Sequence, residues 1–170
     1  MAHDATEVIV RGLAVENGHV LLCRHVGKGY RYLPGGHVEF PEPARDALAR
    51  EMDEEAGVTV RTGELLLTHE HVFRQKGKLR HELNLVFAMT LDRARVGGQS
   101  EQRGGDVPRG TSPTAPSVPS PVPSQEPDIA FDWIALGALN EADVRPASMV
   151  RWIRSAARGE APTFLSEILD

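Results

Sequence analysis

The sequence predicts a domain of the α/β class. Three observations predict it: β-branched and apolar segments near the start, in the middle and late in the chain, one helical repeat of apolar residues from Pro43 to Ala56, and a second after Pro146. The chain has 170 residues, 41% of them apolar and 25% charged, which is ordinary for one globular domain. We therefore expect a single domain over residues 1–170 with its core at about 6–158.

The first elements read as a strand hairpin. Residues 6–15 are rich in β-branched side chains, Glu16-Asn17-Gly18 is a turn signal, and residues 19–24 are apolar again. Cys23, the single cysteine, lies in the second apolar segment and is expected to pack in the core as a small hydrophobic residue. A short segment, 31–33, then leads into the turn Pro34-Gly35-Gly36.

The clearest helix begins at Pro43. Apolar residues recur at helical spacing, Pro43 suits a first helical position, no hydroxyl residue is present as a cap, and Gly57 suits the residue just past the end. The apolar positions of this repeat are Ala44, Ala47, Leu48 and Met52.

The middle of the chain is dominated by strands. Residues 58–61 and 64–73, a turn at 75–78 and residues 79–91 predict a second hairpin, and residues 128–135 predict one more strand. Beyond Pro146 the helical spacing of Met149, Trp152, Ile153 and Ala156 predicts an amphipathic helix. Its other face carries Arg151, Arg154 and Arg158, which we interpret as solvated rather than as a phosphate or partner site.

Residues 96–127 differ sharply in composition from the rest. Seventeen of these 32 residues are Gly, Pro or Ser, and seven of the chain's 12 prolines lie here. Such a segment buries too little apolar surface to offset its ordering entropy, so we expect a disordered insertion within the domain. Docking of a proline-recognising partner is the alternative reading.

Charge and hydropathy exclude some classes of protein. The net charge of −5 and the absence of a basic stripe argue against a nucleic-acid binder. No apolar run approaches the length of about 20 residues that spans a bilayer, and the polar start lacks a signal sequence, so we expect a cytoplasmic protein without a membrane partner. The amphipathic last helix is compatible with a homodimer.

Three glutamates of the first helix, Glu51, Glu54 and Glu55, share one helical face. Their like charges repel, and a hard divalent cation such as Mg2+, which takes oxygen ligands, removes that repulsion. An isolated cluster of this kind is more often a solvated face.

The residues around these glutamates favour a metal site over a solvated face. The segment GHVEFPEPARDALAREMDEEAGV, residues 36–58, fits the pattern GX5EX7REUXEEXGU, with U an apolar residue, and a chance match is about one in a million or less. The segment resembles the Nudix box, and LPGGHVE, GHVLLCR, LNLVFAM and FDWIALGAL follow the usual order of Nudix domains. The resemblance implies an α/β/α sandwich with a mixed sheet, in which the box forms a loop, a helix and a loop. Pro41 and Pro43, which flank Glu42, depart from the residues many relatives carry there.

The resemblance also implies the reaction and its residues. Mg2+, or Mn2+, would be held by the Gly36 carbonyl together with Glu51, Glu54 and Glu55, with Arg50 and Glu42 as a supporting ion pair. The implied activity is pyrophosphohydrolysis of a nucleoside diphosphate linked to another moiety, X, by water attack at phosphorus. The expected catalytic residues are Glu51, Glu54, Arg50 and Glu42.

The box pattern does not identify a single general base, nor does it identify the residues that contact the substrate. A box glutamate, Glu51 or Glu54, is one expectation for the base, and Glu70 and Glu82 are the candidates outside it; the rings of His69 and His71 would share a strand face. Expected substrate contacts are Arg24, Tyr30, Tyr32, His37 and Glu39.

Two other functions remain open. A catalytically silent nucleotide sensor or protein-interaction module would keep the fold without turnover, and action on the 5′ end of RNA would require a basic surface that the sequence lacks. The identity of X is not readable from these motifs.

Overall fold

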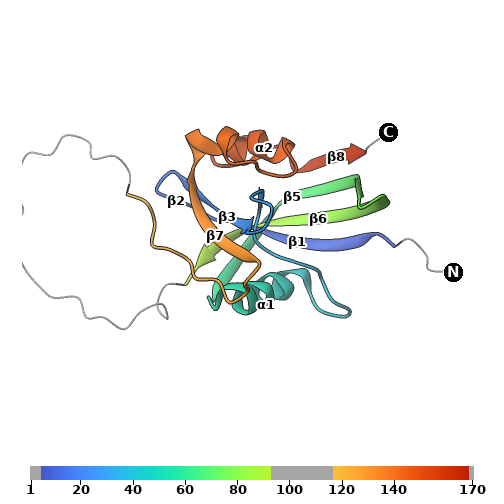
Figure 1. The fold of residues 1–170 in the computed structure, drawn as a ribbon, viewed down its shortest axis with the longest axis horizontal. Coiled ribbons are helices and arrows are strands. Elements are labelled where there is room, and N and C mark those ends of the chain that lie inside the picture. Colours follow the sequence, from blue (N-terminus) through green and yellow to red (C-terminus); the bar gives the residue numbers. More distant parts are fainter. Residues whose placement is uncertain (1–4, 93–116, 169–170) are drawn as a thin grey trace, which may run out of the picture.

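The computed structural model of the protein describes residues 5–92 and 117–168 (Figure 1). Two sheets lie between two helices, α1 (Ala44–Ala56) on one side and α2 (Ser148–Ala156) on the other, which confirms the predicted α/β/α sandwich. The strands are β1 (Glu7–Leu13), β2 (Val15–Glu16), β3 (His19–His25), β4 (Arg31–Tyr32), β5 (Val60–Gln75), β6 (Lys78–Leu91), β7 (Ile129–Ala135) and β8 (Phe164–Ile168). A 3-10 helix, η2 (Leu136–Glu141), precedes α2.

The first sheet is mixed, as expected, with the order β1-β6-β5-β8. Strands β5 and β6 form an antiparallel hairpin, whereas β1 lies parallel to β6 and β8 lies parallel to β5. In the second sheet β3 is central and pairs antiparallel with β2, β4 and β7. The turn at residues 34–36, where the box begins, follows β4 and is hydrogen-bonded to β1 through the Val10 and Gly12 amides.

The predicted N-terminal hairpin is only partly right. The turn at Asn17-Gly18 has positive φ values of 47° and 71°, and β2 pairs with β3 through it. Residues 7–13, however, leave this sheet and pair with β6 in the other one. A local pattern identifies the turn but not a partner strand about 75 residues away, so the prediction joined all of residues 6–15 to one hairpin.

Helix α1 agrees closely with the sequence. Pro43 is the N-cap rather than the first helical residue, and no side chain caps the helix, as expected. Gly57 has φ 64°, the left-handed conformation that favours glycine, and its amide donates to the Asp53 carbonyl. Leu48 and Met52 are fully buried, so the predicted apolar stripe faces the core.

Other elements differ from their predictions in length or were not predicted. Strand β5 runs unbroken from Val60 to Gln75, with irregular pairing between Thr62 and Leu67 where the sequence predicted two segments. Strand β8 and the helix η2 were not predicted, because β8 is a short edge strand and η2 has no extended helical repeat. Cys23 is fully buried, as expected.

Part of the predicted insertion packs on the domain. Residues 93–116 lie outside the described residues, but residues 117–127 differ from the expectation of disorder. Val122 is buried in the core, and Trp133 Nε1 donates to the Ser120 carbonyl at 3.0 Å. The main-chain amide of Gln125 donates to the main-chain carbonyl of Glu55 at 2.7 Å. These contacts bring the segment to the end of α1.

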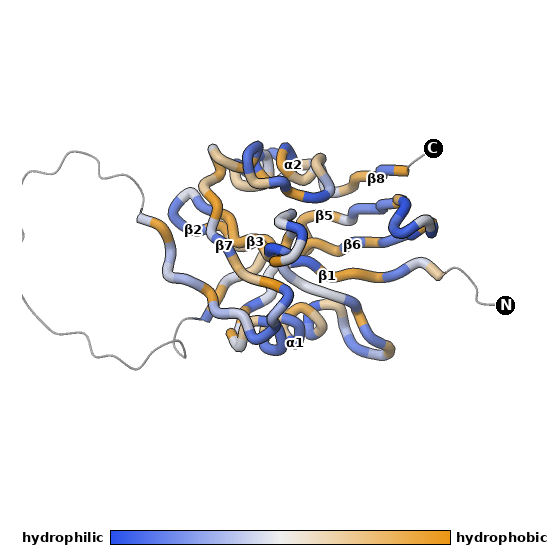
Figure 2. The backbone as a smooth tube through the Cα atoms, in the orientation of Figure 1, coloured by the Kyte–Doolittle hydropathy of each residue, from blue (hydrophilic) through white to orange (hydrophobic). Residues whose placement is uncertain are grey.

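Two buried clusters hold the layers together. One, centred on Leu48, Met52 and Leu21, lies under α1, and the other, centred on Leu139, Trp152 and Ile153, lies under α2. Figure 2 shows hydrophobic residues along β1, β6 and β7, whereas the tip of the β5–β6 hairpin and the loop before α1 are hydrophilic. In the described part of the chain, no helix is long and apolar enough to cross a membrane.

Candidate active site

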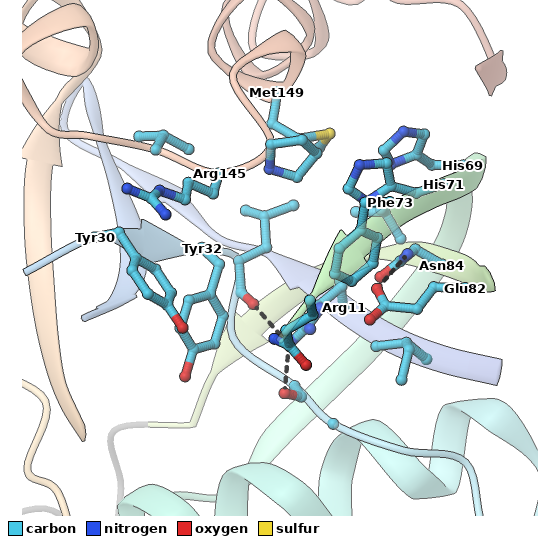
Figure 3. A pocket seen from close by; sticks show the side chains of 18 of the residues that line it. Arg11, Tyr30, Tyr32, His69, His71, Phe73, Glu82, Asn84, Arg145 and Met149 are labelled. Carbon is cyan, nitrogen blue, oxygen red and sulfur yellow. Dashed lines mark hydrogen bonds between the residues drawn. The ribbon is translucent and has the colours of Figure 1, made fainter. Parts of the chain in front are cut away.

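An open cavity of about 860 Å3 lies beside the box, between the first sheet and the segment that enters α2 (Figure 3). Gly35, Gly36, Glu51 and Glu55 line one part of it. Its other lining residues include Arg11, Tyr30, Tyr32, His69, His71, Phe73, Glu82, Asn84, Arg145 and Met149.

The glycine turn fits closely against β1 and α1. Gly35 has φ 127°, and a Cβ there would overlap the Val10 carbonyl; a Cβ on Gly36 would overlap the Glu51 carboxylate. The Val10 amide donates to the Gly36 carbonyl at 2.9 Å, and Arg11 Nη1 donates to the Gly35 carbonyl at 2.6 Å. The Gly36 carbonyl, an expected metal ligand, therefore has one lone pair already in use and a second one left.

Arg50 forms the expected ion pair with Glu42 and extends it. Its Nη2 donates to Glu42 Oε1 at 2.7 Å, and its Nη1 donates to Glu51 at 3.0 Å and to Glu54 at 2.9 Å. The Arg50 hydrogen bonds, followed by the bond from the Glu39 amide, lower the pKa of Glu42. Arg50 thus offsets the repulsion between the glutamates. Within residues 5–92 and 117–168, no three His, Cys, Asp or Glu side chains are gathered as ready metal ligands.

Glu55 differs from the other box glutamates because Arg50 does not donate to its carboxylate. Its Oε2 is buried and has no hydrogen-bond partner among the described residues. Burial first, and then the charge of Glu51, raise the pKa of Glu55 to about 7, and the Arg11 guanidinium partly opposes this. A buried, orphaned carboxylate oxygen next to a second carboxylate fits a hard divalent cation, whose charge would remove both costs.

Glu126 is a carboxylate near the box that the sequence reasoning missed. Its charge contributes to the raised pKa of Glu55, and the neighbouring Gln125 amide is bonded to the Glu55 carbonyl. The charge of Glu126, at the end of the Pro-rich segment, therefore acts on Glu55, although Glu126 is not among the residues that line the cavity. The signal was hidden because composition assigned residues 96–127 to disorder.

The expected substrate contacts divide into two groups. Tyr30 and Tyr32 line the cavity, with Arg145 4.7 Å from the Tyr30 ring centre and Arg11 5.2 Å from that of Tyr32. His37 also lines the cavity, and its side chain is 66% exposed.

The remaining two expected substrate contacts are not among the residues that line this cavity. The Arg24 side chain donates to Asp132 at 2.8 Å, on the second sheet. The Glu39 side chain is exposed, and the Glu39 amide donates to Glu42.

The two base candidates outside the box are also separated by the fold. Glu82 lines the cavity, whereas Glu70 does not and accepts hydrogen bonds from His81 at 3.1 Å and Ser166 at 2.9 Å. The rings of His69 and His71 share a strand face, as expected, and stack at 5.3 Å between centres.

Comparison with known proteins agrees with this geometry. The family model described as NUDIX domain matches residues 5–110. A search of curated proteins finds no match. Among solved structures, a MutT protein from Bacillus halodurans is 19% identical over 95% of this chain and 90% of its own, with a TM-score of 0.65.

Two further structures have the same fold. A MutT protein from Methanosarcina mazei Go1 is 21% identical over 94% of this chain and 98% of its own, with a TM-score of 0.61. An ADP-ribose pyrophosphatase from Streptococcus suis 89-1591 is 14% identical over 96% and 100%, with a TM-score of 0.53. The family model covers more than half of the chain and includes the box, of which Glu51 and Glu55 line the cavity and Glu42 and Glu54 do not, so the chain belongs to the NUDIX domain family and is a Nudix hydrolase.

Proposed function

We propose that this hydrolase cleaves the diphosphate of a nucleoside diphosphate linked to a second moiety, in a reaction that depends on Mg2+. The observation that carries the proposal is the buried, unpartnered Glu55 oxygen beside Glu51 and the close-packed Gly36 main chain. Glu51, Glu54, Glu55 and the Gly36 carbonyl would hold the ion. When bound, Mg2+ supplies neutralisation of the diphosphate charge and polarisation of the attacked phosphorus.

The residues of the chain divide the remaining work. Arg50 orients Glu42, Glu51 and Glu54 through four hydrogen bonds to their carboxylates. Each of these bonds joins two charged groups, so turning a carboxylate away from Arg50 loses a charge-assisted hydrogen bond. Arg11 and Arg145, which both line the cavity, supply positive charge where an anionic substrate would enter.

Proton transfer requires a carboxylate close to the attacking water. That water attacks phosphorus, a glutamate accepts its proton, and the bond between phosphorus and the departing phosphate oxygen breaks. Glu51 and Glu82, which line the cavity, are proposed bases, and so is Glu54, which shares Arg50 with Glu51. Glu70 is engaged by His81 and Ser166 on the sheet.

The test is phosphate release, coupled to a phosphatase, from nucleotide diphosphate derivatives with Mg2+. The compounds are ADP-ribose, nucleoside triphosphates, diadenosine polyphosphates, nucleotide sugars and NADH. We expect at least one to turn over and Glu54→Gln to lower its rate by about 100-fold or more. Asp53→Asn is the matched control, because Asp53 is exposed on the same helix and makes the same change of charge.

Calorimetric titration with Mg2+ gives a readout that does not need turnover, and Glu54→Gln should weaken that binding whereas Asp53→Asn should not. Absence of turnover with Mg2+ and Mn2+, while a nucleotide still binds, would instead support the silent sensor module. Full activity of Glu54→Gln would contradict the role given to the box.

A further inference from the structure

The first sheet contributes polar and aromatic side chains to one side of the cavity, which we call its floor. Along a strand, alternate residues share a face, and directly paired residues on neighbouring strands share that face too. Asn84 pairs with His69 and with Ile9, and Glu82 pairs with His71, and all five residues line the cavity. The first sheet therefore presents a polar pair, Glu82 and Asn84, flanked by rings on one side and by β1 on the other.

The polar pair is fixed and rich in acceptors. Asn84 Nδ2 donates to Glu82 Oε2 at 3.3 Å, and Asn84 is only 7% exposed (Figure 3). With one N–H of the amide turned toward Glu82, the groups left for a ligand are the second carboxylate oxygen, Asn84 Oδ1 and the other amide N–H, so acceptors outnumber donors. The Glu82 carboxylate, which only accepts, therefore favours a ligand that offers donors.

The wall beside the pair is aromatic. His71 and Phe73 stack with 4.6 Å between ring centres, and His69 extends the row while its Nε2 is hydrogen-bonded to Glu167 at 2.8 Å. Burial and the neighbouring His69 lower the pKa of His71, so its ring is uncharged near neutral pH. Such a row suits a flat aromatic ligand ring.

The floor lies at a useful distance from the carboxylates of the box. Ile9 pairs with Asn84 on one side and forms a bridge with His37, the residue after Gly36, on the other. Two strand spacings, about 10 Å, thus separate Asn84 from the glycine turn. A ribose can span the gap between a base on the floor and a diphosphate at the turn.

We infer that Glu82 and Asn84 read the edge of a guanine-type base, making a guanine nucleotide the preferred nucleoside part of the substrate. Guanine offers two adjacent donors, the ring N1–H and the exocyclic amino group, which match a carboxylate. In adenine N1 is an acceptor, so it cannot donate to the Glu82 carboxylate, and the hydrogen bond that guanine N1–H would make there is absent. This inference rests on the proposed function for its substrate class, but it assigns Glu82 to recognition rather than to proton transfer.

The experiment measures binding apart from turnover. Wild-type protein in EDTA is titrated by calorimetry with GMP, IMP and AMP; IMP keeps the N1–H and lacks the amino group. We expect GMP to bind at least about 10-fold more tightly than AMP, with IMP between them. Glu82→Gln should remove the preference, and the matched control Glu70→Gln, which changes a carboxylate outside the cavity, should keep it.

Equal affinities for GMP and AMP in the wild-type protein would overturn the inference, and that comparison needs no variant to fold. Retention of the preference in Glu82→Gln, with a loss of kcat of orders of magnitude for every substrate, would instead identify Glu82 as the general base. Hydrolysis of the panel without a base preference leaves the proposed function standing and refutes the guanine site. A guanine preference with no hydrolysis of any guanine-containing compound refutes the proposed function alone.

Discussion

Replacement of Glu55 by glutamine should stabilise the metal-free protein at pH 8. The pKa of Glu55 is raised from 4.5 to about 7, a shift that corresponds to at most about 3.4 kcal/mol between the two protonation states. Because the carboxylate keeps some contact with solvent, screening reduces this to about 1–2 kcal/mol. Glutamine keeps the shape of the side chain and carries no charge, so it removes this cost.

The sign of the pH dependence follows from the raised pKa. Between pH 4.5 and about 7 the folded protein binds the Glu55 proton and the unfolded chain does not, so this contribution to stability falls as pH rises through that window. Urea unfolding in EDTA should therefore show Glu55→Gln to be more stable than wild type by about 1–2 kcal/mol at pH 8 and nearly equal at pH 5. Asp53→Asn should show no such pH-dependent gain. A Glu55→Gln variant that is less stable than wild type at pH 8, or whose gain is the same at both pH values, would refute the argument.

Two substitutions and one labelling experiment test the packing of the core and the glycine turn. Met52→Ala removes a fully buried side chain of α1 and should lower the free energy of unfolding by about 2–5 kcal/mol in urea; a loss below about 1 kcal/mol would contradict the tight packing of the core. Gly36→Ala places a methyl group against the Glu51 carboxylate and should lower the hydrolysis rate by about 100-fold, whereas Gly137→Ala, where nothing lies nearby, should not; equal rates for the two variants would refute the close approach. Burial raises the pKa of Cys23 from 9.0 to about 11, so its thiolate is about 100-fold scarcer at pH 8. Iodoacetamide should therefore label Cys23 in the folded protein at least about 100-fold more slowly than in urea, and similar rates would show that the thiol is accessible.

The sequence predicts most of the elements that are formed by contacts between residues close together in the chain. The repeat of apolar residues from Pro43 to Ala56 and the left-handed Gly57 locate α1, because a helix satisfies its hydrogen bonds within itself. The β5–β6 hairpin was readable for a similar reason, since its strands adjoin a turn in which Lys76 and Gly77 have positive φ. The parallel pairing of β1 with β6 and of β8 with β5 was not, because each requires a long crossover and no local signal sets its register.

The amino-acid pattern of residues 36–58 is enough to identify the family and the carboxylates of the box. Their spacing places Glu51, Glu54 and Glu55 on one helical face wherever that helix packs, and the Arg50–Glu42 pair observed at 2.7 Å follows from the same segment. The residues that surround these carboxylates depend on how the chain folds. The fold brought Glu126 from the Pro-rich segment to Glu55, placed Glu82 in the cavity and Glu70 outside it, and paired Arg24 with Asp132. These positions depend on contacts between residues far apart in the chain. The periodicity of the sequence predicts on which face of a helix or strand a side chain lies, but not which other element packs against that face.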